Sequence, residues 1–281
     1  MKFVDPKTDI AFKKIFGDQA HKNILIEFLN ELLELEYPIE DVKISNSYQS
    51  PHLYGLKETT LDIKAKDTSG RAFIVEMQVE KDRTFAKRAM YYSSNAYSQQ
   101  LDKTEKYHLL KPVIFLGILD FSIFDHQSPC SRHLILNGEN QSHDLKDLEF
   151  NFIELPKFTK LEPELTTLAD KWLYFLKHAD DLQQIPHNAD TPALQEAYQI
   201  AALHHWTQEE LDIYESQGLK LGRDRNVVET AREDGIAEGL AKGELQGKMT
   251  VAKNLLAILD DAAIAQVTGF DTNIIANLRQ S

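Results

Sequence analysis

The sequence is poor in cysteine, in long apolar runs and in positive charge. With a single cysteine, Cys130, it cannot form an intrachain disulfide, and no Cys/His spacing fits a structural zinc site. No apolar run approaches the roughly 18 residues needed to span a bilayer, and the first residues, MKFVDPKTD, lack the apolar segment of a signal peptide. We therefore expect a cytoplasmic protein with no membrane-spanning segment.

The shortage of positive charge limits how the protein could contact nucleic acid. The formal net charge is −13, whereas proteins that coat nucleic acid by bulk electrostatics usually have a basic surface. Any contact with DNA must therefore be local. The 42% of hydrophobic and 27% of charged residues are ordinary for a folded globular protein, so we expect a chain with a packed core.

The periodicity of apolar residues changes near residue 164. Before it, helical spacing alternates with strand-like runs, which predicts an α/β core over residues 1–164. The expected helices are 9–16, 21–35 and 82–103, and the expected strands are 39–45, 59–67, 71–80, 111–121, 131–137 and 148–155. Residues 165–281 read as helices, with breaks near Pro186, Pro192 and Gly218.

The helical C-terminal region contains a glycine at every fourth position from 235 to 247. Four glycines within a helix cost roughly 1 kcal/mol each relative to alanine, so the segment is either a frayed, charged connector or a site of close helix contact. Residues 259–281 resemble a helix-turn-helix, but Arg279 is their one positive charge. We predict an oligomerisation or regulatory role for this region rather than DNA reading.

The residues that could carry chemistry lie in the stretch TLDIKAKDTSGRAFIVEMQV, residues 60–79. Side chains alternate between the faces of a strand, so Glu76 and Gln78 share one face with Ile74, while Met77 takes the other. A tight turn after Asp67 would bring the preceding strand alongside. Asp62 can then meet Glu76.

Two converging carboxylates repel each other unless a cation lies between them. Mg²⁺ suits such a place, because it prefers oxygen ligands and usually accepts one or two carboxylates. Asp62, Glu76 and the backbone carbonyl of Met77 would supply that metal site, with water as the nucleophile. In the alternative interpretation Asp62 caps the strand end, and Glu76 and Gln78 lie on a solvated sheet face; the pattern alone leaves both open.

The spacing of Asp, about 14 residues and then Glu-x-Gln resembles the PD-(D/E)XK nuclease motif. More closely, the chain resembles the recombination-promoting nuclease family, also labelled PD-(D/E)XK nuclease family transposases. The segments that carry the resemblance, in order, are KTDIAFKKIFG, LIEFLNELL, LDIKAKDTSG, FIVEMQVE, KRAMYYSSNAYSQQL, KPVIFLGILDF and FIELPKF. Each segment alone is weak, but their order and spacing together are specific.

The resemblance implies a restriction-endonuclease-like mixed sheet flanked by helices, followed by an all-helical region, and a Mg²⁺-dependent DNA endonuclease linked to recombination or mobile elements. It implies Asp62 and Glu76 as metal ligands, and Gln78 where the wider superfamily has lysine. Leu61 replaces the proline of the motif. Gln is usual in this family, but an amide can only orient by hydrogen bonds, so the electrostatic task falls on the metal. Lys64 could supply the missing charge or be a solvated lysine.

Basic residues follow the motif and could hold the DNA backbone, or could simply be a solvated helix start. They are Lys81, Arg83, Lys87 and Arg88. A helix acid sometimes completes the metal site in this superfamily, which makes Asp9 and Glu27 further candidates. We expect a homodimer, because cutting two strands is eased by two sites. The alternative function is a catalytically weak or inactive nuclease-fold module that binds nucleic acid or a protein partner.

Overall fold

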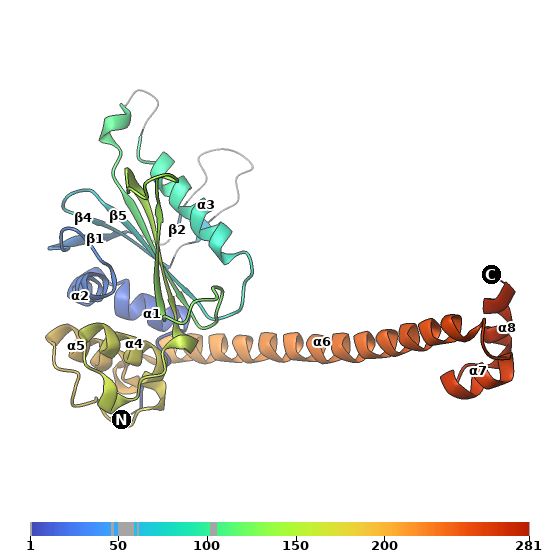
Figure 1. Cartoon of the computed structure of the whole chain (residues 1–281). Helices are drawn as coiled ribbons and strands as arrows, with labels where there is room; N and C mark the ends of the chain where they lie inside the picture. Colours follow the sequence, from blue (N-terminus) through green and yellow to red (C-terminus); the bar gives the residue numbers. More distant parts are fainter. Residues whose placement is uncertain (1, 46–47, 50–58, 61, 102–105, 281) are drawn as a thin grey trace. The chain divides into compact units, whose positions relative to one another are not determined.

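A computed structural model describes residues 2–45, 48–49, 59–60, 62–101 and 106–280 (Figure 1). The chain forms two compact units, Met1–Gly218 and Leu219–Ser281. The first unit contains a mixed six-stranded sheet with helices on both faces, as expected from the sequence. Leu61, the residue at the proline position of the motif, lies outside the described residues.

The six-stranded sheet has the strand order β1-β4-β5-β6-β8-β7. The β5–β6 and β6–β8 pairs are parallel and the other neighbours are antiparallel. The strands are β1 (Val42–Ser45), β4 (Ile63–Asp67), β5 (Ala72–Gln78), β6 (Val113–Leu119), β7 (Cys130–Ile135) and β8 (Leu145–Glu154), and β2 (Tyr48–Gln49) pairs separately with β3 (Thr59–Thr60). All seven residues of β6 are buried, so this strand is covered on both faces of the sheet.

The turn between β4 and β5 fixes the register of the hairpin. Asp67 Oδ1 accepts the backbone N–H groups of Ser69 and Arg71 at 3.0 and 2.9 Å, and Gly70 adopts a φ of 92°, which glycine tolerates without strain. This closure pairs Ile63 with Val75. Asp62, one residue before β4, therefore comes opposite Glu76.

Two hydrophobic layers cover the sheet (Figure 1). On one face, helix α3 (Phe85–Ser98) packs on β6 and β8 through residues that include Phe85, Phe115 and Phe152. On the other face, Phe73 and Val75 of β5 join the core formed with α1 (Asp9–Phe16) and α2 (Lys22–Leu32). The expected alternation along β5 is therefore confirmed, with Glu76 and Gln78 on the α3 side.

The helices after residue 165 complete the same core. Trp172 of α4 (Leu168–His178) lies 5.5 Å, ring centre to ring centre, from Phe28, and α5 (Pro192–Ala201) packs on α1 and α2. The N-terminal segment is tied to this group by the Val4 N–H, which donates to the Ala201 carbonyl at 2.8 Å. Residues 165–218 thus pack with residues 1–164, and a separate oligomerisation or regulatory role for residues 165–281 stays a prediction.

The breaks expected near Pro186 and Pro192 are confirmed, because α4 ends at His178 and α5 begins at Pro192. The break expected near Gly218 is wrong, because α6 (Gln208–Leu255) runs through it. Stretches rich in Glu, Lys, Arg and Ala flank the glycines of α6, and such residues favour a helix strongly enough to outweigh isolated glycines.

The second unit comprises the remainder of α6 with α7 (Asp261–Thr268) and α8 (Thr272–Gln280). Gly269, at a φ of 71°, separates α7 from α8, and Ile264 and Ile275 meet Ala252 in a small core. Arg279 donates to Asp261 at 2.8 Å, so the positive charge of this unit's last helix is engaged within it. None of the helices in the described segments is both long and apolar enough to cross a membrane.

Candidate active site

Asp62 and Glu76 hold each other through reciprocal hydrogen bonds at the carboxyl end of β5. The backbone N–H of Asp62 donates to Glu76 Oε1 at 3.1 Å, and the N–H of Met77 donates to Asp62 Oδ2 at 2.8 Å. One oxygen of each carboxylate thus accepts a hydrogen bond from the backbone of the other strand. Among the described residues, no backbone N–H donates to the second oxygen of either carboxylate.

Glu76 is buried and Asp62 is half-buried. Glu76 is 4% exposed, so the interpretation that it lies on a solvated sheet face is wrong. Burial raises the pKa of Glu76 to about 8, assisted by the negative charge of Asp62, and burial raises the pKa of Asp62 to about 6. Burial disfavours the ionised form of both acids. A cation bound between them would stabilise that form and lower both pKa values.

The donor set fits a hard cation such as Mg²⁺. Alternate residues of a strand direct their backbone groups to opposite neighbours, and Gln78 bonds toward β6 by accepting the Asp120 N–H at 3.0 Å. The carbonyl of Met77 therefore faces the Asp62 side, beyond the last β4–β5 pair at Ile63. Two carboxylates, a carbonyl and water oxygens are ligands that Mg²⁺ accepts. No group of three or more His, Cys, Asp or Glu in the described part of the chain forms a metal site by itself.

Helix α1 brings a third acid and a cation to this pair. Lys13 Nζ lies 2.6 Å from Asp9 Oδ1 and 3.8 Å from Asp62 Oδ1. The Asp9 carboxyl raises the pKa of Asp62 further by its charge and through a hydrogen bond, whereas Lys13 lowers it. Of the two helix acids expected from the sequence, Asp9 is therefore at the pair, while Glu27 accepts a hydrogen bond from Thr191 Oγ1 at 2.7 Å elsewhere. Lys13 was not foreseen, although its i,i+4 spacing from Asp9 is a usable signal.

Gln78 lies beside an arginine of α3. Gln78 Oε1 accepts from Arg88 Nη2 at 2.7 Å, and Gln78 Nε2 donates to the Glu80 carbonyl at 3.1 Å. Sequence reasoning named Gln78 and Arg88 separately and did not pair them. Helical spacing cannot show which face of α3 meets the sheet.

Comparison with known protein families supplies the decisive observation. The family model described as PD-(D/E)XK nuclease family transposase matches residues 6–231. The chain belongs to this family. No curated protein and no solved structure shows significant similarity to it. Membership in the PD-(D/E)XK nuclease family transposases agrees with the mixed sheet and supports a nuclease or mobile-element function.

The remaining basic candidates of this PD-(D/E)XK chain lie between β5 and the first turns of α3. Lys81, Arg83 and Lys87 are exposed, whereas Arg88 is half-buried. The structure thus separates three solvent-facing cations from one that is fixed beside Gln78. Only the exposed three match the picture of a diffuse contact with a DNA backbone.

Lys64, the alternative source of positive charge, lies on β4. Its Cα partner is Ile74, two residues before Glu76 on β5. Burial and the charge of neighbouring Lys66 lower the pKa of Lys64. Lys64 lies opposite Ile74 and Asp62 lies opposite Glu76, so Lys64 is further from Gln78 along the hairpin than Asp62 is.

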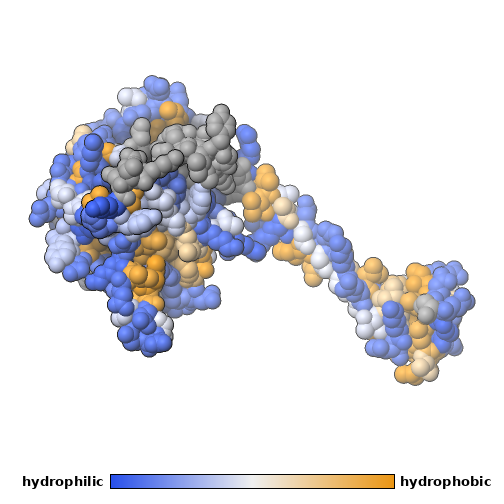
Figure 2. Space-filling view, turned by 90° about the horizontal axis from the view of Figure 1, so that it is seen from above, coloured by the Kyte–Doolittle hydropathy of each residue, from blue (hydrophilic) through white to orange (hydrophobic). Residues whose placement is uncertain are grey.

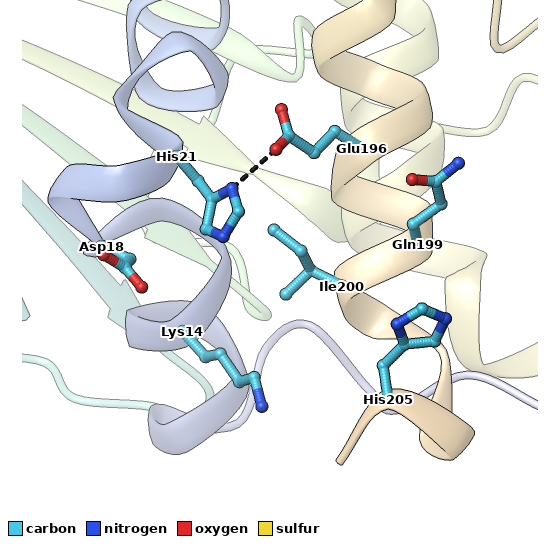
Figure 3. Close-up of a pocket in the computed structure, with 7 residues that line it drawn as sticks. All are labelled: Lys14, Asp18, His21, Glu196, Gln199, Ile200 and His205. Atoms are coloured by element: carbon cyan, nitrogen blue, oxygen red, sulfur yellow. Dashed lines mark hydrogen bonds and ion pairs between the residues drawn. The ribbon is translucent and has the colours of Figure 1, made fainter.

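A separate pocket of about 290 Å³ opens between α1 and α5 (Figure 3). His21 Nδ1 lies 2.6 Å from Glu196 Oε1, and Lys14 pairs with Glu210 at 2.6 Å. His21, Glu196 and Lys14 already have partners in the pocket wall or next to it. The pocket therefore has fewer groups available to bind a ligand than the Asp62–Glu76 pair has. Neither Asp62 nor Glu76 lines it.

Proposed function

We propose that this PD-(D/E)XK protein is a Mg²⁺-dependent DNA endonuclease that hydrolyses phosphodiester bonds in recombination or in the movement of mobile elements. The observation that supports it best is the contact of half-buried Asp62 with buried Glu76, in which each carboxylate accepts one backbone N–H from the other strand. A structural role alone would not require two acids in contact, because an uncompensated buried charge costs several kcal/mol.

Asp62, Glu76 and the Met77 carbonyl would hold the ion, and Asp9 would add an acid at its side. A bound Mg²⁺ supplies polarisation of a phosphoryl oxygen and a lowered pKa for water. The protein's own groups bind and orient: the reciprocal backbone bonds fix both carboxylates, so they need no rearrangement before catalysis.

The exposed Lys81, Arg83 and Lys87 would contact DNA phosphates locally, in keeping with the overall negative charge. Such contacts are sequence-independent and weaken with salt. A homodimer would place two of these sites on the two strands of a duplex.

Plasmid cleavage tests the proposal. Purified protein is incubated with supercoiled plasmid, with and without Mg²⁺, beside Asp62→Ala, Glu76→Ala and the control Glu139→Ala, which removes an exposed loop carboxylate. We expect Mg²⁺-dependent nicking by the parent and the control, and a loss of at least about 10²-fold in both site variants, the order seen when one charge-stabilising group is removed. Nicking that survives both site substitutions would exclude the assigned site.

Gln78 favours one second function, a module that binds DNA without cutting it, because a neutral amide stands where superfamily nucleases carry lysine. Parent protein that shifts a DNA duplex in a gel but leaves plasmid intact at every Mg²⁺ concentration would establish that function and exclude the endonuclease.

A further inference from the structure

Arg88 is held from several sides although it belongs to the first turns of an amphipathic helix. Its Nη2 donates to Gln78 Oε1 at 2.7 Å and its Nη1 to Asp82 Oδ2 at 3.1 Å. The guanidinium carbon lies 5.1 Å from the ring centre of Phe85 and 5.9 Å from that of Tyr92. A long flexible side chain is therefore fixed in one place before any ligand arrives.

The two hydrogen-bond partners of Arg88 differ in charge, because Gln78 is a neutral amide and Asp82 forms an ion pair with the guanidinium at 3.1 Å. Gln78 is neutral, and the other carboxylate oxygen of Asp82 already accepts the N–H and hydroxyl of Thr84 at 2.7 and 2.6 Å. A guanidinium has five N–H groups, of which these two bonds use two. Within the described chain, Nε is buried and has no hydrogen-bond partner.

The position of Arg88 relative to the acid pair follows from β5. Gln78 is the next residue after Glu76 on the same face, roughly 6 to 7 Å along the strand. Burial is the largest effect on the pKa of Glu76 and raises it, whereas the charge of Arg88 is among the smaller effects that lower it. The guanidinium thus belongs to the electrostatic environment of the acid pair, whereas Lys81, Arg83 and Lys87 are exposed to solvent.

We infer that Gln78 and Arg88 together replace the lysine of the wider superfamily: Gln78 positions the guanidinium, and Arg88 donates to a non-bridging oxygen of the scissile phosphate and stabilises its developing charge. This inference rests on the proposed endonuclease function. Arginine suits the task because its planar fork binds phosphate oxygens in pairs.

The identity of residue 78 follows from the same contact. A lysine there would place a second cation against Arg88 at hydrogen-bond distance, and a glutamate would add a second carboxylate to the one that Asp82 already supplies. A glutamine accepts from Arg88 without adding a charge of either sign. Lys64, opposite Ile74, makes no comparable contact with Gln78 in the described residues.

The test compares Arg88→Ala, Arg88→Lys, Gln78→Glu and the double variant Gln78→Lys/Arg88→Ala, with Arg232→Ala on exposed α6 as the control. Steady-state cleavage of a duplex oligonucleotide gives kcat and KM, and thermal unfolding confirms that each variant is folded. We expect kcat to fall by about 10²-fold for Arg88→Ala and for Gln78→Glu, with KM changed less than about threefold, because one phosphate contact contributes little to ground-state binding. The kcat of Arg88→Lys should lie between those of the parent and Arg88→Ala.

The double variant and chemical rescue separate this role from a purely structural one. Gln78→Lys should restore kcat in the Arg88→Ala background by at least about tenfold, since it returns a cation to the same place, and added guanidinium should raise the rate of Arg88→Ala. Parent cleavage combined with an unchanged kcat for folded Arg88→Ala, or with no recovery in the double variant and with guanidinium, would overturn the inference alone. Absence of cleavage by the parent would instead refute the proposed function.

Discussion

At the scale of single residues, the site depends on two carboxylates kept together without a compensating charge between them. The backbone N–H groups of Asp62 and Met77 stabilise them, and Lys13 stands at 3.8 Å from Asp62. These contacts do not overcome burial, because the pKa of both acids stays raised. In the metal-free protein, ionisation of this pair therefore lowers the free energy of unfolding, by an amount that depends on pH.

We predict that metal-free protein loses stability as the pH rises. In the unfolded chain Asp and Glu titrate near their ordinary pKa of roughly 4, whereas in the folded chain Asp62 and Glu76 have pKa values of about 6 and about 8. Between these limits the folded state binds more protons, so the free energy of unfolding falls with rising pH. The fall in melting temperature from pH 5 to 8.5 should be smaller by roughly 5 °C in Glu76→Gln than in the parent.

Adding Mg²⁺ provides the complementary measurement, because the proposed metal site would bind the ion when both acids are ionised. It should raise the melting temperature of the parent more at pH 8 than at pH 5 and have little effect on Glu76→Gln. Glu139→Gln, in an exposed loop, should follow the parent. Parallel pH curves for parent and Glu76→Gln would show that the pair carries no such linkage.

The residues of the site differ in how far the sequence could predict them. The contact between Asp62 and Glu76 could be predicted. Side chains alternate along each strand with a period of two residues, and the short turn between the two strands then fixes which side chains meet. Asp9 could be named only as one of two helix acids, and the Gln78–Arg88 contact not at all. Both depend on how a helix is rotated against the sheet, which long-range packing decides.

At the scale of elements, the site depends on how closely α3 approaches β6. Gly117 of β6 pairs with Glu76, and a Cβ added to it would lie 2.8 Å from the Phe85 ring of α3 and 3.1 Å from the rings of Phe115 and Phe152. The helix that carries Arg88 therefore rests where β6 has no side chain. The aromatic rings around Gly117 are buried and cannot easily move aside.

We predict that Gly117→Ala pushes α3 outward and loosens the Arg88–Gln78 contact. Overpacking of a filled core costs about 1–3 kcal/mol, which chemical denaturation would measure. Cleavage should fall at temperatures where the variant is still folded, because Arg88 moves with α3. Gly138→Ala, where an added Cβ meets nothing within 4 Å, is the control. A folded Gly117→Ala protein with full cleavage would show that the spacing of α3 does not matter.

At the scale of the whole molecule, the long helix α6 has residues in both units and exposes hydrophobic side chains. The family model ends at residue 231, so most of the second unit lies beyond it. Figure 2 shows hydrophobic residues exposed among hydrophilic ones along α6. They are Ile213, Leu219, Val227, Val228, Ile236, Leu240, Leu245 and Val251. A Cβ added to Gly235, Gly239, Gly243 or Gly247 would meet nothing within 4 Å, so the described chain itself gives no reason for these glycines.

We predict that this helix pairs with a second copy of the chain, because four glycines cost stability unless close backbone approach repays it. Light scattering should give twice the chain mass for the full protein and a monomer for a chain ending at Gly218. Gly239→Leu with Gly243→Leu should also give a monomer. Leucine favours a helix more than glycine does, so loss of the dimer would report a blocked approach rather than an unfolded helix. Full-length protein that stays monomeric up to high concentration would leave two-strand cleavage to two independent encounters, and nicked plasmid would then accumulate before linear product.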